Sequence, residues 1–308
     1  GEIYGSKRLE AALRAARPPV QPPPKPAPMR ALFLIPGDGV SQLQAFPAVS
    51  ATAEQLGFVI QVVCPPAQGP LWTLIPAVEK VIPFPFAEAN LADWANLLGS
   101  IRDPDFQLAV NLAPSARLDL TLSMSHIPVR VASGGFSATT TVPVPSAAWP
   151  PEGLAAHLAA VGVTLDAAAF RLAIQPSALA EASASAPAGE GPLLLLAPSG
   201  DAGDWPAAQW QQLPQRIRSS LPSLRVREVP PATAASAARR AAEIAASDVV
   251  LASDPITTEL ALFCGTPLVA LGRDPASLPG RPEVRAVGER AQLAGLGLEP
   301  VLQALGLS

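Results

Sequence analysis

The sequence predicts an α/β protein made of two doubly wound, Rossmann-like domains. Short apolar segments alternate with helical segments, and the alternation starts again after a low-complexity stretch at 178–192. Near-continuous apolar segments are typical of parallel strands that are buried on both faces. Residues 247–271 show the pattern most clearly, in the order strand, polar turn, helix, Gly-Thr-Pro corner and strand. The length of 308 residues fits two domains of about 150 residues each.

Residues 1–28 are predicted to form an arm before the first domain. A short helix is expected over 6–17, where Leu9 and Leu13 are four residues apart. Residues 18–28 are dense in proline and predict a polyproline spacer. The arm is either a fusion remnant or a docking helix on a stiff tether, and the sequence leaves both open.

The N-terminal domain is expected over 29–177. Its predicted strands are 31–35, 58–64, 80–84, 106–112 and 128–133. Its predicted helices are 43–57, 72–78, 90–103, 115–125 and 152–163, with a loop at 137–150. His157 lies among alanines and leucines in the last of these helices, which predicts a structural rather than a catalytic histidine.

Residues 178–192 are rich in Ala, Ser, Gly and Pro and are predicted to link this domain to a second one at 193–308. The predicted strands of the second domain are 193–199, 224–229, 249–253, 267–271 and 283–287. Its predicted helices are 206–221, 233–247, 256–264 and 298–307. Two such domains are expected to form a cleft between the carboxyl ends of their strands.

Composition excludes several classes of function. The net charge of −4 argues against a nucleic-acid partner. No apolar run reaches the roughly 18–20 residues of a membrane span, and residues 1–30 have no signal-peptide core, so we expect no transmembrane segment and a cytoplasmic location. Two cysteines fit a reducing compartment, and two histidines make a His-rich metal site improbable. We expect no metal and no resident cofactor.

Four stretches carry a resemblance to a known family. They are LFLIPGDGVSQLQAFPAV (32–49), VEKVIPFPF (78–86), LLLLAPSGDAGDWPAAQWQQL (193–213) and AASDVVLASDPITTELALFCGTPLVALGR (245–273). Their order resembles glycosyltransferase family 9, the ADP-heptose:lipopolysaccharide heptosyltransferases, over about residues 29–305. The resemblance implies the two-domain GT-B fold. It also implies a nucleotide-diphosphate sugar as donor, provided that the chain is active.

The family carries an aspartate, regarded as the catalytic base, in the turn after the first strand. When the sequences are anchored on Pro47 without a gap, the matching residue here is Ser41. Asp38 reaches that position only if the turn shifts its register. A serine without a partner is no base near neutral pH, so Asp38 and Ser41 are the catalytic candidates, and Asp38 is also an ordinary tight-turn residue.

The second domain of the family holds the phosphates, and here its motifs are altered. The cation before Trp-Pro is replaced by Gly203 and Asp204. The family's Asp-[Ser/Thr]-Gly-x-x-His is Asp254-Pro255-Ile256-Thr257-Thr258-Glu259 in this sequence. Glycine and histidine are thus replaced by Ile256 and Glu259, while the aspartate is kept.

The residues that remain as candidates for binding a nucleotide sugar are Ser199, Gly200, Asp254, Thr257, Thr258 and Glu259. Helix N-termini there could still offer N–H donors, although Asp254 is equally expected to be a helix cap. Because two carboxylates would face a diphosphate, we predict that the cleft wall at 199–204 and 254–259 is acidic and filled.

Three interpretations of function follow. The first is a catalytically degenerate glycosyltransferase-like protein that serves binding or assembly and contacts a protein partner through 1–28 or through the folded body. The second is an active sugar-nucleotide-dependent transferase that uses Asp38 as base and acts on a glycan or lipopolysaccharide-type acceptor. The third is a small-molecule binding protein that uses the cleft. The sequence favours the first.

Overall fold

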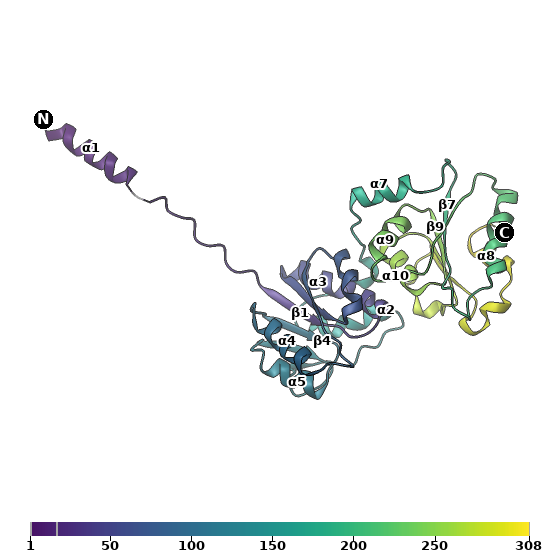
Figure 1. The fold of residues 1–308 in the computed structure, drawn as a ribbon, viewed down its shortest axis with the longest axis horizontal. Coiled ribbons are helices and arrows are strands. Elements are labelled where there is room, and N and C mark those ends of the chain that lie inside the picture. The colour runs from purple at the N-terminus through teal and green to yellow at the C-terminus, as the bar shows by residue number, and fades with distance from the viewer. Residues whose placement is uncertain (1, 17, 308) are drawn as a thin grey trace.

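The computed structural model describes residues 2–16 and 18–307. Figure 1 shows two α/β bodies side by side and a helix, α1 (Glu2–Ala15), held apart from them by an extended segment. Residues 1, 17 and 308, which belong to the predicted arm and the predicted C-terminal domain, lie outside the described residues. Among the residues described, no helix combines the length and the apolar character needed to cross a bilayer.

The first body contains a parallel sheet in the order β3-β2-β1-β4-β5-β6. Its strands are β1 (Arg30–Leu34), β2 (Val59–Cys64), β3 (Val78–Pro83), β4 (Leu108–Asn111), β5 (Val129–Ala132) and β6 (Thr140–Thr141). Its helices are α2 (Gly39–Gln44), α3 (Phe46–Leu56), η1 (Pro66–Leu74), α4 (Leu91–Arg102), α5 (Ala116–Ser123), η2 (Pro150–Leu154), α6 (Ala155–Ala159) and η3 (Ala167–Ala169). This strand order is that of a Rossmann fold.

The second body contains a parallel sheet in the order β11-β10-β9-β7-β8. Its strands are β7 (Leu193–Ala197), β8 (Arg225–Glu228), β9 (Val249–Ala252), β10 (Leu268–Leu271) and β11 (Val284–Val287). Its helices are α8 (Ala207–Ser220), α9 (Ala237–Ala245), α10 (Pro255–Cys264), η4 (Pro275–Ser277), η5 (Arg290–Gly295) and α11 (Leu298–Ala304). The two doubly wound domains that the sequence predicts are confirmed.

Four predicted elements differ from the structure. The helix expected over 43–57 is two helices and begins earlier, because the Asp38 side chain caps α2 at Gly39. The helix expected at 72–78 is the 3-10 helix η1 (Pro66–Leu74), since the prolines of that segment interrupt a regular α-helix. The helix at 152–163 is split into η2 and α6, and the loop at 137–150 contains the short strand β6.

The predicted segment 178–192 contains ordered structure. Helix α7 (Pro176–Ala184) begins just before it and packs against α9 of the second body. The remainder of the segment runs as loop into β7.

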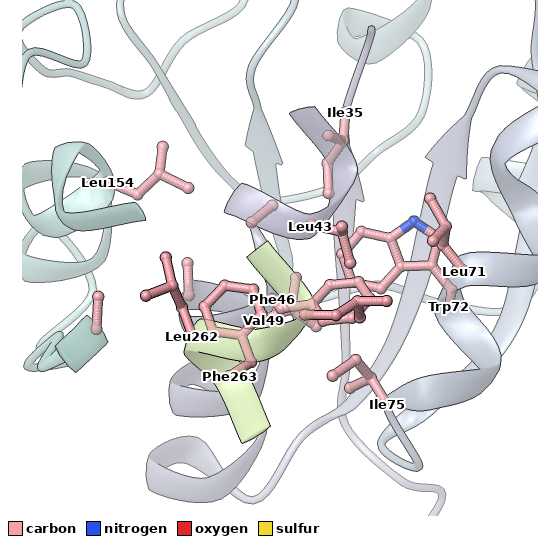
Figure 2. Close-up of a cluster of buried hydrophobic side chains, with 14 of the residues drawn as sticks. Ile35, Leu43, Phe46, Val49, Leu71, Trp72, Ile75, Leu154, Leu262 and Phe263 are labelled. Atoms are coloured by element: carbon pink, nitrogen blue, oxygen red, sulfur yellow. The ribbon is translucent and has the colours of Figure 1, made fainter. Parts of the chain in front are cut away.

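One hydrophobic cluster spans the two bodies, and each body has a further cluster of its own. Helix α10 follows β9 of the second sheet, and it also packs against α2 of the first body. Figure 2 shows Leu262 and Phe263 of α10 among Phe46 and Val49 of α3, with Leu154 on the other side. The ring of Phe263 is fully buried, with its centroid 5.2 Å from that of Phe170 and 6.1 Å from that of Phe46. The polypeptide therefore behaves as two sheets around a common interior.

His157 of α6 is buried, whereas the sequence predicts a hydrogen-bonded or half-exposed structural histidine there. Its side chain is only 1% exposed, and among the described residues neither ring nitrogen has a hydrogen-bond partner. Burial disfavours the charged imidazolium and lowers the pKa of His157. The unfolded chain therefore binds more protons than the folded chain once the pH falls below about 6.5, the ordinary histidine pKa.

Stability is therefore expected to fall as the pH drops below about 6.5, by at most about 1.4 kcal/mol per pH unit from this one group. Urea midpoints measured between about pH 7.5 and about pH 5.5 test this. His157→Leu should remove that part of the decline. The exposed His126, whose φ of 64° suits asparagine, supplies the control His126→Asn, which should leave the decline unchanged. An equal decline in both variants would contradict the assignment to His157.

Candidate functional site

The candidate site lies where the carboxyl ends of the two sheets face each other. In sheets of this type a ligand binds at the point where the strand order reverses. That point lies between β1 and β4 in the first sheet and between β7 and β9 in the second. The segments that follow β1, β7 and β9 hold every candidate residue predicted from the sequence.

After β1, the catalytic candidates Asp38 and Ser41 bond to each other. Asp38 Oδ1 accepts the backbone N–H and the hydroxyl of Ser41, each at 3.0 Å, so Asp38 serves as the N-cap of α2. The side chain of Gln42, which is fully buried, holds this turn by hydrogen bonds on its inner side. Its Nε2 atom donates to the carbonyl of Ile35 at 2.9 Å, and its Oε1 atom accepts the indole N–H of Trp72 at 2.9 Å. The turn is therefore stabilised from within the protein.

After β7, a carboxylate of the protein accepts hydrogen bonds from the backbone N–H groups of the turn. Asp204 Oδ2 accepts the N–H groups of Ser199 at 3.1 Å and of Gly200 at 3.3 Å. The hydroxyl of Ser253 accepts the Ser199 N–H as well, at 2.9 Å. Such adjacent N–H groups are what a Gly-rich turn offers to a phosphate. In this chain the Asp204 carboxylate takes that place.

After β9, Asp254 is the N-cap of α10, as one of the two sequence interpretations predicts. Its Oδ2 atom accepts the backbone N–H of Thr257 at 3.1 Å, the hydroxyl of Thr257 at 2.5 Å and the N–H of Ala232 at 3.2 Å. The hydroxyl of Thr258 donates to the Asp254 carbonyl at 2.9 Å. All of Asp254, Thr257 and Thr258 are buried, so these polar groups are bonded internally.

A buried arginine that the sequence analysis missed neutralises this turn. Arg240 of α9 is 3% exposed and donates to the Thr257 hydroxyl at 2.7 Å and to the Pro230 carbonyl at 2.6 Å. Its nitrogens lie 3.8 Å from Asp254 Oδ2 and 3.7 Å from Glu243 Oε1. Burial lowers the pKa of Arg240, and the two carboxylates oppose that change. The positive charge of Arg240 is therefore paired with Asp254 and Glu243 of the protein itself.

Glu259, which replaces the family's histidine, is also directed inward. It is 1% exposed, and its Oε1 atom accepts from Arg273 at 3.0 Å. Burial raises the pKa of Glu259, while Arg273 opposes the rise. The other oxygen of Glu259, Oε2, has no hydrogen-bond partner among the described residues. Glu259, on the helix that packs against α2, is therefore held inside the second body by Arg273.

Ile256, which replaces the family's glycine, fills the space between the two turns. A methyl group added at Gly39 of α2 would lie 3.0 Å from Ile256 Cδ1 and 3.3 Å from Gln68 Oε1. The first turn of α10 thus packs directly against the first turn of α2. The structure agrees with the prediction of a filled cleft wall that carries acids at 204, 254 and 259, although those acids are bonded to N–H groups and arginines.

Sequence reasoning found the turns but not the residues that close them. Gln42 and Arg240 are ordinary polar residues beside or within predicted helices, Arg273 follows a predicted strand, and Trp149 lies in a predicted loop. The Arg239–Arg240 pair in an otherwise alanine-rich amphipathic helix was the one available signal. Within 2–16 and 18–307, no three Cys, His, Asp or Glu side chains come together as metal ligands.

A scan against protein-family models found no match, and no curated protein matches the sequence. Among solved structures, the chain is similar to Escherichia coli ADP-heptose LPS heptosyltransferase II, with 17% identity, a TM-score of 0.68, and coverage of 90% of this chain and 98% of that chain. It is also similar to a glycosyl transferase family 9 protein of Veillonella parvula, with 13% identity, a TM-score of 0.70, and coverage of 90% and 96%. Heptosyltransferase WaaC of E. coli with ADP gives 13% identity, a TM-score of 0.66, and coverage of 90% and 99%.

Two parallel sheets joined in this way define a GT-B glycosyltransferase fold. More narrowly, the chain has the fold of the glycosyltransferase family 9 heptosyltransferases, as the resemblance implied.

Proposed function

We propose that this chain is a degenerate glycosyltransferase that does not transfer sugar and serves as a binding or assembly module in the cytoplasm. The observation that carries the proposal is the Asp204 carboxylate, which accepts the N–H groups of Ser199 and Gly200. A diphosphate would have to displace this carboxylate and then remain beside its charge. Like charges about 4 Å apart near a protein surface disfavour binding by roughly 4 kcal/mol.

The bonding of Asp38 supports the same proposal. Asp38 is engaged by the N–H and hydroxyl of Ser41, and a base must instead reach the hydroxyl of an acceptor. The space that such an acceptor needs beside Asp38 is taken up where Ile256 packs on Gly39. No observation favours an active transferase. In that alternative a nucleotide-diphosphate sugar would be a donor substrate.

Isothermal titration with ADP and UDP, together with a sugar-transfer assay using their sugar derivatives, tests the proposal. The unaltered chain is expected to give no binding and no transfer. Asp204→Ser frees the Gly200 N–H, leaves the Ser199 N–H bonded to Ser253 alone and removes one negative charge, so it should gain binding of ADP. Asp201→Ser is the matched control, because Asp201 lies in the same loop, carries the same charge and bonds to Gly203 and Arg290 instead.

Two results would contradict the proposal. Micromolar binding with turnover by the unaltered chain would establish an active enzyme. Equal behaviour of Asp204→Ser and Asp201→Ser would remove the Asp204 carboxylate as the cause of the loss.

A further inference from the structure

The proline-rich segment 18–28 connects α1 to the first body and takes no part in the candidate site. It contains seven prolines, and every one of its residues is exposed. No backbone hydrogen bond joins it to any other described residue. Figure 1 shows it as an extended stretch of chain that stands clear of both bodies. The segment is therefore open to a partner along its whole length.

The sequence of this segment favours the polyproline II conformation. Proline fixes φ near about −65°, and a residue that precedes a proline avoids the helical region. The residues of the segment that precede a proline are Pro18, Gln21, Pro22, Pro23, Lys25 and Ala27. Because so much of the backbone is restricted before binding, a partner that takes the extended form loses little entropy in ordering it.

Two adjacent edges of this helix form an apolar ridge that ends in a cation. A polyproline II helix has three residues per turn, so residues three apart lie on one edge. The apolar pairs Pro19–Val20 and Pro22–Pro23 therefore lie one turn apart, and Lys25 follows one turn after Pro22. Val20 is 91% exposed, and Lys25 is the only charged residue of the segment. A simple spacer has no need of a large apolar side chain in that position, whereas a ligand does.

We propose that residues 18–28 are the ligand of a partner protein whose aromatic-lined groove binds a polyproline II helix and ends at an acidic side chain. Grooves of this kind take proline-rich segments with prolines three residues apart and exploit their preformed extended shape. The pairs Pro19–Val20 and Pro22–Pro23 fill two successive slots between the aromatic rings. Lys25 then lies at the end of the groove, where a carboxylate pairs with its charge and fixes the direction of the segment.

This inference rests on the proposed binding role and names the segment and the class of partner that would carry it. Its test uses no nucleotide, so a failure here would leave the argument from Asp204 untouched. At about 3.1 Å per residue the segment is roughly 34 Å long, which leaves room for a small domain to bind beside the two bodies.

Isothermal titration of the full chain with a set of purified SH3 domains, each with an aromatic groove that ends at an acidic residue, tests the inference. At least one of them is expected to bind with a dissociation constant below about 1 mM. Pro23→Ala removes a ring from the ridge and should raise that constant at least about tenfold. Lys25→Glu should also weaken binding, and more strongly at low salt than at high salt.

Pro24→Ala is the matched control. It removes a neighbouring proline from the same run, but Pro24 lies on the third edge, which faces away from the groove. The dissociation constant should change by less than about twofold. Because the segment stands clear of both bodies, all these variants should share the thermal midpoint of the unaltered chain.

Three results would overturn the inference. The first is a full chain that binds none of these domains. The second is an equal loss of binding in Pro23→Ala and Pro24→Ala, which would mean that the prolines act only by stiffening a spacer. The third is binding that Lys25→Glu leaves unchanged, because an acidic end of the groove would then have no role.

Discussion

Phe263→Ala is expected to destabilise both bodies together, by about 3–5 kcal/mol. The Phe263 ring is fully buried and lies between rings of the first body, with centroids 5.2 Å away at Phe170, 6.1 Å at Phe46 and 6.4 Å at Trp149. Truncation leaves a cavity in the interior that the two sheets share. Because that interior belongs to both sheets, the loss acts on the whole chain.

Denaturant titration followed by hydrogen exchange in each body measures this effect. A single transition should move to lower denaturant, with equal loss of protection in β1 and β9. Phe136→Ala is the control, since Phe136 is 69% exposed and its removal should change stability by less than about 0.5 kcal/mol. Two separate transitions, of which one is unaffected by Phe263→Ala, would show that the bodies are independent.

Arg240→Ala is expected to cost about 3–5 kcal/mol, because it leaves buried acids without their counter-charge. Asp254 is 4% exposed, and Arg240 also holds the Thr257 hydroxyl and the Pro230 carbonyl. Arg240→Lys keeps the charge but loses the forked geometry, so it should recover only part of the stability.

The neighbouring Arg239 supplies the control for this prediction. It lies on the same helix, is exposed, and should tolerate alanine at a cost of less than about 0.5 kcal/mol. Equal effects of the alanine substitutions at 239 and 240 would show that the network around Asp254 contributes little.

The sequence was sufficient to predict the fold and, apart from β6, the strands of the described residues. Parallel strands buried on both faces leave a nearly continuous apolar pattern, and each of β1, β7, β9 and β10 overlaps its predicted segment. Helix boundaries were less predictable where a side chain decides them. Asp38 moved the start of a predicted helix from 43 to Gly39, because its cap is a contact between side chain and backbone.

The sequence placed the candidate residues in the turns after the strands, but it did not predict their hydrogen-bond and ion-pair partners. The altered motif residues Asp204, Ile256 and Glu259 could be read from the chain, and they lie at the facing strand ends. Their partners could not be read in this way. Arg240 reaches Asp254 from α9 and Arg273 reaches Glu259 from the segment after β10, so only the packing of these elements brings each pair together.

The common interior has a consequence for how this protein can move and how it can be divided. An enzyme that admits a donor and an acceptor between two lobes must hinge, whereas α10 is wedged into the opposite lobe by Leu262 and Phe263. Cutting the chain within 178–192 would leave each fragment with an exposed hydrophobic surface where the other lobe had packed. Fragments of this kind are expected to precipitate or to reassociate when mixed, so the two lobes should fold stably only as one chain.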